Sequence, residues 1–162
     1  MGENRPKRKP TRLPNYSYSN VGYYFITVCA KNKEKLFGTV VGGGALDAPY
    51  VALTESGKIV EQYVGSTNKL QGIQVDKYVI MPNHLHMILI VDEESEIQAR
   101  ANERIPHAIG TLKRLVNREI GMNVFQRSYH DHVIRGEKDY HKIWSYIDDN
   151  PRRWKDDCFY VE

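Results

Sequence analysis

Apolar and polar positions alternate along the chain in patterns that predict both strands and helices. Residues 23–29 (YYFITVC) are rich in aromatic and β-branched residues, which is typical of a central strand. Residues 74–80 and 84–91 predict two further strands. The tripeptide MPN separates them, and its proline and asparagine favour a turn. We therefore expect these two strands to form a tight antiparallel hairpin.

The spacing of apolar residues predicts three helices. The first begins at Glu55, directly after a capping Thr54. The second spans about residues 105–119, with an apolar stripe on one side and basic residues on the other. The third covers residues 137–150, and Pro151 stops it because proline cannot continue a helix.

The remaining segments complete a ferredoxin-like pattern. Residues 40–50 (VVGGGALDAPY) favour a flexible loop at the tip of a small hairpin, whose returning strand is residues 50–53. Residues 128–134 predict a short closing strand. The order of elements matches the split βαβ pattern. We therefore predict an α+β fold, in which an antiparallel sheet has helices on one face and an additional C-terminal helix.

Length and composition predict one globular domain with a short arm. Of the 162 residues, 1–20 are polar and contain three prolines, which indicates an arm, and 21–162 form the domain. No apolar run approaches the roughly 20 residues of a membrane helix. No apolar stretch follows the basic start, as a secretory signal would require. The two cysteines lie far apart, which fits a reducing cytosol and predicts a cytoplasmic protein.

Positive charge is concentrated in the arm. The net charge is only +3, so the chain is not basic throughout. The first dozen residues nevertheless contain one acid, Glu3, and five cations, which are Arg5, Lys7, Arg8, Lys9 and Arg12. Such a cluster suits a polyanion, and a solvated tail is the equally good alternative.

Two histidines stand one residue apart at the start of a very apolar strand, in PNHLHMILIV. Side chains alternate across a strand, so His84 and His86 point to the same face, with Cα atoms roughly 7 Å apart. Their imidazoles can converge on one metal ion, and the alternative is two histidines on an exposed face. A third ligand must come from elsewhere. The candidates are His107, His130, Asp131, His132, His141 and the end of the last helix.

The last predicted helix carries a second candidate pair. Tyr146 and Asn150 are four residues apart, so they lie one above the other at the edge of the core-facing stripe. A phenol can act as a covalent nucleophile, and an amide oxygen can bind a hard divalent cation. The alternative is that Tyr146 packs and Asn150 merely ends the helix. The stripe itself is predicted from Tyr140, Ile143, Trp144 and Ile147.

Three stretches of the chain, in order, resemble a known family. They are RLPNYSYSNVGYYFITVC, YVIMPNHLHMILIV and QRSYHDHVIRGEKDYHKIWSYIDDNP. The chain resembles the HUH single-tyrosine transposases of the insertion-sequence type, in particular the REP-associated tyrosine transposases, where REP denotes a repeated extragenic palindrome. The glycine-rich segment at residues 40–50 departs from this pattern, and we interpret it as a tolerated loop.

The resemblance implies a fold, a metal site and a reaction. The implied fold is ferredoxin-like. His84, His86 and Asn150 would bind Mg²⁺ or Mn²⁺, and Tyr146 would cleave and rejoin single-stranded DNA at hairpins through a 5′-phosphotyrosine. Three residues also look typical of the family and rank second as ligands or proton carriers, namely His130, Asp131 and His132. No small-molecule cofactor is implied. The expected location is the bacterial cytoplasm beside the nucleoid, and monomer and dimer both remain open.

Further basic residues are expected to contact DNA phosphates together with the arm. These are Lys113, Arg114 and Arg118 on the second helix, and Arg127 and Arg135 on either side of the closing strand.

Two rival functions differ in testable ways. Histidine-triad nucleotide hydrolases need a third alternate histidine, and here that position is Ile88. The stronger rival is a module that binds hairpin nucleic acid without cutting it. Tyrosines near the first strand could stack on bases in such a module, namely Tyr16, Tyr18, Tyr23 and Tyr24. Metal-dependent formation of a covalent protein–DNA adduct separates this rival from the transposase.

Overall fold

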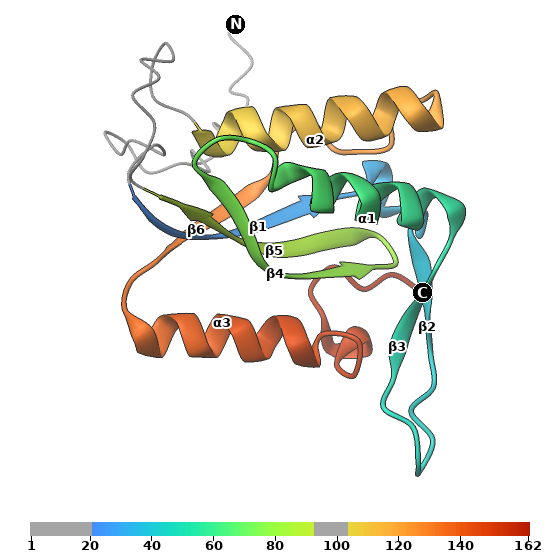
Figure 1. Ribbon diagram of the computed structural model, residues 1–162. Coiled ribbons are helices and arrows are strands. Elements are labelled where there is room, and N and C mark those ends of the chain that lie inside the picture. The colour runs from blue at the N-terminus through green and yellow to red at the C-terminus, as the bar shows by residue number, and fades with distance from the viewer. Residues whose placement is uncertain (1–20, 93–103) are drawn as a thin grey trace, which may run out of the picture.

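A four-stranded antiparallel sheet forms the centre of the molecule (Figure 1). The computed structural model describes residues 21–92 and 104–162, so the predicted basic arm lies outside the described residues. The strand order is β4-β5-β1-β6, which is the order of a ferredoxin-like sheet. The strands are β1 (Gly22–Cys29), β4 (Ile73–Met81), β5 (His84–Val91) and β6 (His130–Ile134). The predicted fold class is confirmed.

Helices cover both faces of this sheet (Figure 1). On one face lie α1 (Glu55–Thr67) and α2 (Arg104–Ile120), and their apolar stripes build the larger core against the sheet. On the other face lies α3 (Glu137–Asp149), which packs Ile143 and Ile147 against Ile88 of β5. Because β5 is covered on both faces, seven of its eight residues are buried, as its continuous apolar run requires.

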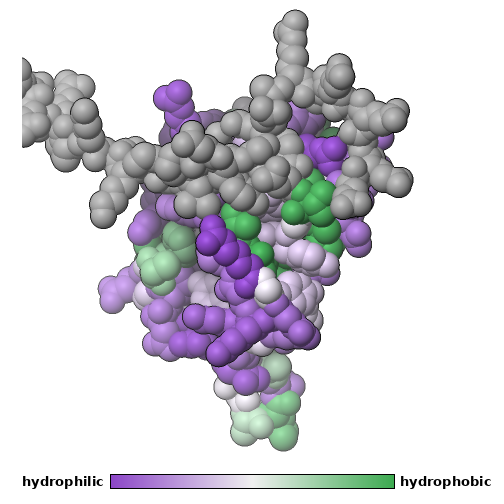
Figure 2. Space-filling model, turned by 90° about the vertical axis from the view of Figure 1, so that its left-hand side faces the viewer, coloured by the Kyte–Doolittle hydropathy of each residue, from purple (hydrophilic) through white to green (hydrophobic). Residues whose placement is uncertain are grey.

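A small hairpin projects from the body of the protein (Figures 1 and 2). It consists of β2 (Gly38–Val41) and β3 (Tyr50–Leu53), joined by the glycine-rich loop. The lower end of the space-filling view is apolar, and Leu46 in this loop is 97% exposed. Two short 3₁₀ turns complete the described elements, η1 (Lys31–Lys33) and η2 (Trp154–Asp156).

The start of α1 anchors the turn between β4 and β5. Thr54 caps the helix as predicted, since its hydroxyl accepts a bond from the N–H of Gly57 (3.1 Å). Gly57 lies so close to the backbone of Phe37 that a Cβ atom would overlap its carbonyl oxygen. The N–H of Phe37 in turn donates to the carbonyl of Pro82 (2.9 Å). The helix therefore holds the turn that precedes His84.

Two local predictions were wrong. Trp144 does not belong to the buried stripe of α3 but is 37% exposed, with Nζ of Lys77 3.8 Å from the centre of its ring. The closing strand begins at His130, two residues later than predicted, because residues 126–128 are held by a side chain of α2. Within the two described ranges, no helix has the length and apolarity needed to cross a membrane.

Candidate active site

His84 and His86 lie on the face of the sheet that α3 covers. The register pairs them with Cys29 and Thr27 of β1, and all four alternate with residues that face α1 and α2. Both imidazoles are buried, at 0% and 1% exposure, and their ring centres are 4.4 Å apart. The two histidines therefore converge, and both rings are shielded from bulk solvent.

Asn83 fixes the orientation of the His84 ring. The amide nitrogen of Asn83 donates to the carbonyls of Lys33 (3.2 Å) and Phe159 (2.8 Å), so its oxygen is left to accept a bond from Nδ1 of His84 (2.9 Å). The lone pair of His84 then resides on Nε2, and no described residue forms a hydrogen bond to that buried atom. Burial lowers the pKa of His84 to about 4. A neutral imidazole with a free, inward lone pair is suited to metal binding.

Thr27 orients the second histidine in the same way. Its hydroxyl lies 2.7 Å from Nδ1 of His86, directly across the paired strands. Nε2 of His86 faces the interior of the site, 3.4 Å from the hydroxyl of Tyr146. Burial, followed by the neighbouring His84, lowers the pKa of His86 well below its usual value.

The helix α3 brings Tyr146 and Asn150 to these histidines. Asn150 is buried, at 1% exposure, and its Oδ1 has no hydrogen-bond partner among the described residues. Tyr146 is half-buried, and its ring packs edge-on against the ring of His86, with 5.3 Å between the ring centres. Burial, followed by the charge of Asp157, raises the pKa of Tyr146 to about 12.

Asp157 is the site residue that the sequence did not reveal. It follows η2 in the chain, and the N–H of Phe159 donates to its Oδ1 (2.7 Å). Its Oδ2 accepts bonds from Tyr146 (3.2 Å) and from the amide of Asn150 (3.0 Å). The same oxygen lies 3.8 Å from Nε2 of His84. The carboxylate of Asp157 thus lies between His84 and the end of α3. No spacing pattern in the sequence distinguishes Asp157 from the adjacent Asp156.

The residues present fit a divalent cation. The ligand atoms of His84, His86 and Asp157 all lie within 4.8 Å of one another. Ligands of one ion bound at about 2.0–2.2 Å are at most roughly 4.4 Å apart, so a small contraction would suffice. His84 Nε2 and Asn150 Oδ1 are one nitrogen and one oxygen donor, both buried and both without a hydrogen-bond partner among the described residues. A buried polar atom without a partner is costly, which is the physical reason to expect a ligand here.

The other candidate ligands lie away from this cluster. His130 is exposed, and its ring is 6.2 Å from Phe159. His132 bonds Asp139 at the start of α3 (2.8 Å). Asp131 pairs with Ile26 and so faces the α1–α2 side of the sheet. His107 on α2 and His141 beside Glu137 are both exposed.

The basic residues that were predicted to contact phosphates lie on several different surfaces of the protein. Arg114 and Arg118 are exposed on α2, across the sheet from the histidines. Arg127 and Arg135 are exposed on either side of β6. Lys113 instead directs its ammonium group at the carbonyls of residues 126–128, at 2.8, 3.3 and 3.1 Å. The five predicted cations of the arm lie outside the described residues.

The fold is that of a REP-associated tyrosine transposase. The solved structure of a REP-associated tyrosine transposase bound to a REP hairpin aligns with a TM-score of 0.63, over 88% of this chain and 73% of that chain, at 19% identity. The resemblance predicted from the motifs is thereby confirmed at the level of the fold.

A relative close in sequence identifies the family. An uncharacterized protein of Haemophilus influenzae is 35% identical over 177 aligned positions, which cover 96% of this chain and 94% of the relative. The chain belongs to the same family as this protein. No family model matches the chain.

Proposed function

We propose that the protein is a metal-dependent nuclease and strand transferase that acts on single-stranded DNA at hairpins. The observation that carries the proposal is the convergence of four side chains from two elements. His84 and His86 come from β5, Tyr146 comes from α3 and Asn150 caps its end, and all lie around Asp157. Such a cluster would supply a metal site and a nucleophile side by side, which is what the family resemblance implies.

His84, His86 and Asp157 would hold the cation, with Asn150 as a further oxygen ligand. Asn83 and Thr27 keep both imidazoles in the orientation that ligation needs. Two nitrogens and oxygen donors suit Mn²⁺, and Mg²⁺ also accepts oxygen donors. A bound cation would neutralise charge on a non-bridging oxygen of the scissile phosphate.

Tyr146 would act as the nucleophile. Its oxygen loses a proton and attacks phosphorus, so that a bond between the tyrosine oxygen and phosphorus forms while the bond to the 3′-oxygen breaks. The 3′-oxygen takes up a proton and leaves as a hydroxyl group. Attack on the phosphotyrosine by a 3′-hydroxyl of another strand reverses the chemistry and rejoins DNA. Asp157, whose Oδ2 accepts the hydrogen bond of the phenol (3.2 Å), keeps Tyr146 in place at the cluster.

The proposed substrate is a DNA hairpin with adjoining unpaired nucleotides. The solved structure of this fold is a transposase bound to a REP hairpin, which supports the same class of ligand here. The basic residues of α2, of the flanks of β6 and of the arm would contribute phosphate contacts.

A covalent-adduct assay tests the proposal. The protein is incubated with labelled single-stranded hairpins from the DNA around its own gene, with Mn²⁺ or with EDTA, and analysed on denaturing gels. We expect a metal-dependent adduct that is lost in Tyr146→Phe. The matched control is Tyr140→Phe on the same helix, whose hydroxyl bonds Asp76 (2.7 Å) instead of the cluster.

Other outcomes would contradict parts of the proposal. An adduct that survives Tyr146→Phe would show that another tyrosine is the nucleophile. Salt-sensitive hairpin binding without any adduct would identify the rival function, a module that binds hairpins without cutting them.

A further inference from the structure

The turn after β1 has a backbone conformation that is unfavourable for residues with a Cβ atom. Asn32 and Lys33 have φ angles of +56° and +57°, and among the described residues other than glycine these two alone have a positive φ. Asparagine tolerates this left-handed region better than lysine does, because its short side chain can bond the local backbone. Glycine would occupy position 33 at little cost. A lysine in a strained conformation therefore indicates a function for its side chain.

Hydrogen bonds fix the backbone of Lys33 relative to the candidate metal site. Its N–H donates to the carbonyl of Ala30, at the end of β1 (3.1 Å). Its carbonyl accepts a bond from the amide of Asn83 (3.2 Å), the residue that orients the ring of His84. The N–H of Ala30 in turn donates to the carbonyl of Asn83 (2.8 Å). The strained turn and a candidate metal ligand thus belong to one hydrogen-bonded unit.

The side chain of Lys33 lies beside the cluster. Cys29 pairs with His84 across the strands, and Cys158 directly follows Asp157. Burial raises the pKa of the Cys29 thiol to about 11, and the charge of Lys33 is the strongest influence that opposes this rise. Burial, followed by the carboxylate of Asp157, raises the pKa of Cys158, and the charge of Lys33 also opposes that rise. Because such an influence decreases with distance, the ammonium group lies near both thiols.

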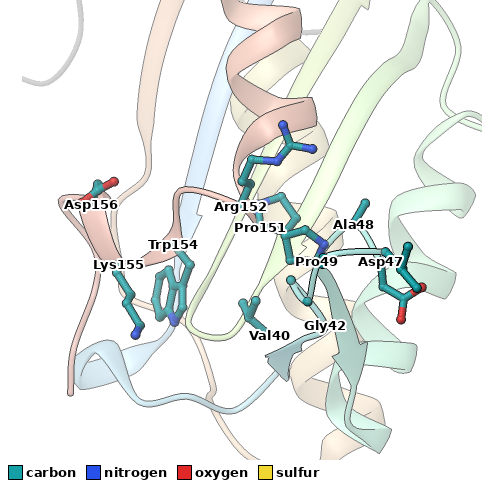
Figure 3. Close-up of a pocket in the computed structure, with 14 residues that line it drawn as sticks. Val40, Gly42, Asp47, Ala48, Pro49, Pro151, Arg152, Trp154, Lys155 and Asp156 are labelled. Atoms are coloured by element: carbon teal, nitrogen blue, oxygen red, sulfur yellow. The ribbon is translucent and has the colours of Figure 1, made fainter.

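The ammonium group of Lys33 can bind a ligand. The residue is exposed, and its side chain forms no hydrogen bond or ion pair within the two ranges that the structure describes. The segment that leads to Asp157 carries further cations, but Arg152 and Lys155 line a groove towards the β2–β3 hairpin (Figure 3). Lys33 instead follows β1, the strand that pairs with the histidine strand β5. Its charge is therefore available on the histidine side of the cluster.

We infer that Lys33 contacts the scissile phosphate and stabilises the transition state of cleavage. The inference rests on the proposed function and adds a catalytic residue to it. Attack by Tyr146 increases the negative charge on the non-bridging oxygens of the phosphate, and the ammonium group donates a hydrogen bond to one of them. Lys33 transfers no proton and forms no covalent bond in this step. The strained turn fixes the point from which the side chain reaches the phosphate.

The test separates the ammonium group from the backbone that carries it. Lys33→Gly removes the charge but accepts the left-handed backbone, so the bond from Asn83 is retained. The matched control is Asn32→Gly, which relaxes the same turn and keeps the lysine. A second control, Lys35→Gly, removes an exposed cation two residues further along the chain. Lys33→Arg keeps a positive charge at the original position.

Three quantities are measured for each protein. They are the rate of adduct formation at saturating labelled hairpin DNA with Mn²⁺, the Mn²⁺ affinity from calorimetric titration, and the midpoint of thermal unfolding. The last two show whether a variant has lost its metal site or its fold, so that a change in rate alone reports the missing ammonium group.

We expect Lys33→Gly to form the adduct at least about a hundredfold more slowly than the wild type. Its Mn²⁺ affinity should be unchanged and its midpoint should not fall, because glycine adopts this backbone without strain. Asn32→Gly and Lys35→Gly should form the adduct at the wild-type rate. Lys33→Arg should be faster than Lys33→Gly, because arginine retains a charge that binds phosphate.

Three results would overturn the inference. Lys33→Gly could form the adduct at the wild-type rate, or Asn32→Gly could lose as much rate, which would assign the effect to the turn itself. A loss of Mn²⁺ affinity in Lys33→Gly would show that the residue acts through the backbone on His84. The proposed function would stand in all three cases if the wild type forms the Tyr146 adduct. Absence of an adduct in the wild type would instead refute the proposed function, and the role of Lys33 with it.

Discussion

The hydroxyl of Thr27 lies 2.7 Å from Nδ1 of His86, between directly paired positions of β1 and β5. The bond fixes the ring so that Nε2 faces the cluster. We therefore expect Thr27→Val, which keeps the shape but removes the hydroxyl, to weaken Mn²⁺ binding about tenfold to a hundredfold. Calorimetric titration with Mn²⁺ measures this directly and does not depend on catalysis.

Thr27→Ser is the control for this prediction. It retains the hydroxyl and should bind Mn²⁺ nearly as well as the wild type. Equal affinities of all three proteins would show that the Thr27 bond does not orient a metal ligand.

Asp157 provides a sharper test of the metal site. In the part of the chain that the structure describes, Asp157 is the one acidic residue with an oxygen within 4.8 Å of the ligand atoms of both His84 and His86. Asp157→Asn keeps a group that can accept the N–H of Phe159 but removes the charge. We expect Mn²⁺ affinity to fall at least about tenfold, because an anionic ligand is replaced by a neutral one.

The neighbouring Asp156→Asn removes the same charge from an exposed side chain and should leave Mn²⁺ affinity unchanged. If both variants lose affinity equally, the loss reflects net charge and Asp157 is not a ligand.

The chemistry of the site was predictable where it follows local periodicity. His84 and His86 point to the same face of the sheet because side chains alternate along a strand. Tyr146 and Asn150 lie on the same side of the helix because they are about one helical turn apart. The approach of α3 to β5 was suggested by the family resemblance. Asp157 could not be found in this way, because the segment after η2 is held by contacts with residues distant in sequence, such as the bond from the amide of Asn83 to the carbonyl of Phe159 (2.8 Å).

The errors in the fold have a similar origin. The spacing in α3 places Trp144 on the apolar stripe, but tertiary packing centres the buried stripe on Ile143 and Ile147. The ammonium group of Lys77 then lies over the exposed indole. Periodicity determines which residues share a side of the helix, whereas the limits of the buried stripe depend on neighbours that are distant in sequence.

Lys113 and Arg114 are adjacent cations on α2, and we expect them to differ in role. Lys113 donates to the carbonyls of residues 126–128, so Lys113→Met should lower the free energy of unfolding by about 1–3 kcal/mol. Arg114 is exposed. Arg114→Met should therefore change stability by less than about 0.5 kcal/mol, and should reduce the salt slope of hairpin binding by about 0.7–0.9. Denaturant unfolding and salt titrations of DNA binding give the two quantities.

The pH dependence of the free energy of unfolding tests whether the ammonium group of Lys113 is buried in the native protein. Burial lowers the pKa of Lys113 from 10.5 to about 8. Between about pH 8 and 10.5 the unfolded chain therefore binds more protons at this residue than the native protein does, so its contribution makes stability rise with pH. The stability difference between wild type and Lys113→Met should grow over this window. A difference that stays constant would contradict burial of the ammonium group.

Two glycines of α1, Gly57 and Gly65, are expected to respond to alanine substitution with opposite changes in stability. A Cβ atom on Gly57 would overlap the carbonyl oxygen of Phe37, whereas a Cβ on Gly65 would meet no atom of the described residues within 4 Å. Gly57→Ala should lower the free energy of unfolding by about 2–3 kcal/mol, because backbone has to move. Gly65→Ala should raise it by about 0.5–1 kcal/mol, since alanine is the better helix former.

The Gly57 variant should also affect the site, because the N–H of Phe37 holds the carbonyl of Pro82 in the turn before His84. We therefore expect Gly57→Ala to weaken Mn²⁺ binding at a temperature where the protein is still folded, and Gly65→Ala to leave it unchanged. Calorimetric titration alongside denaturant unfolding separates the two effects. A destabilised Gly57→Ala protein with wild-type Mn²⁺ affinity would show that the turn keeps its geometry without the support of α1.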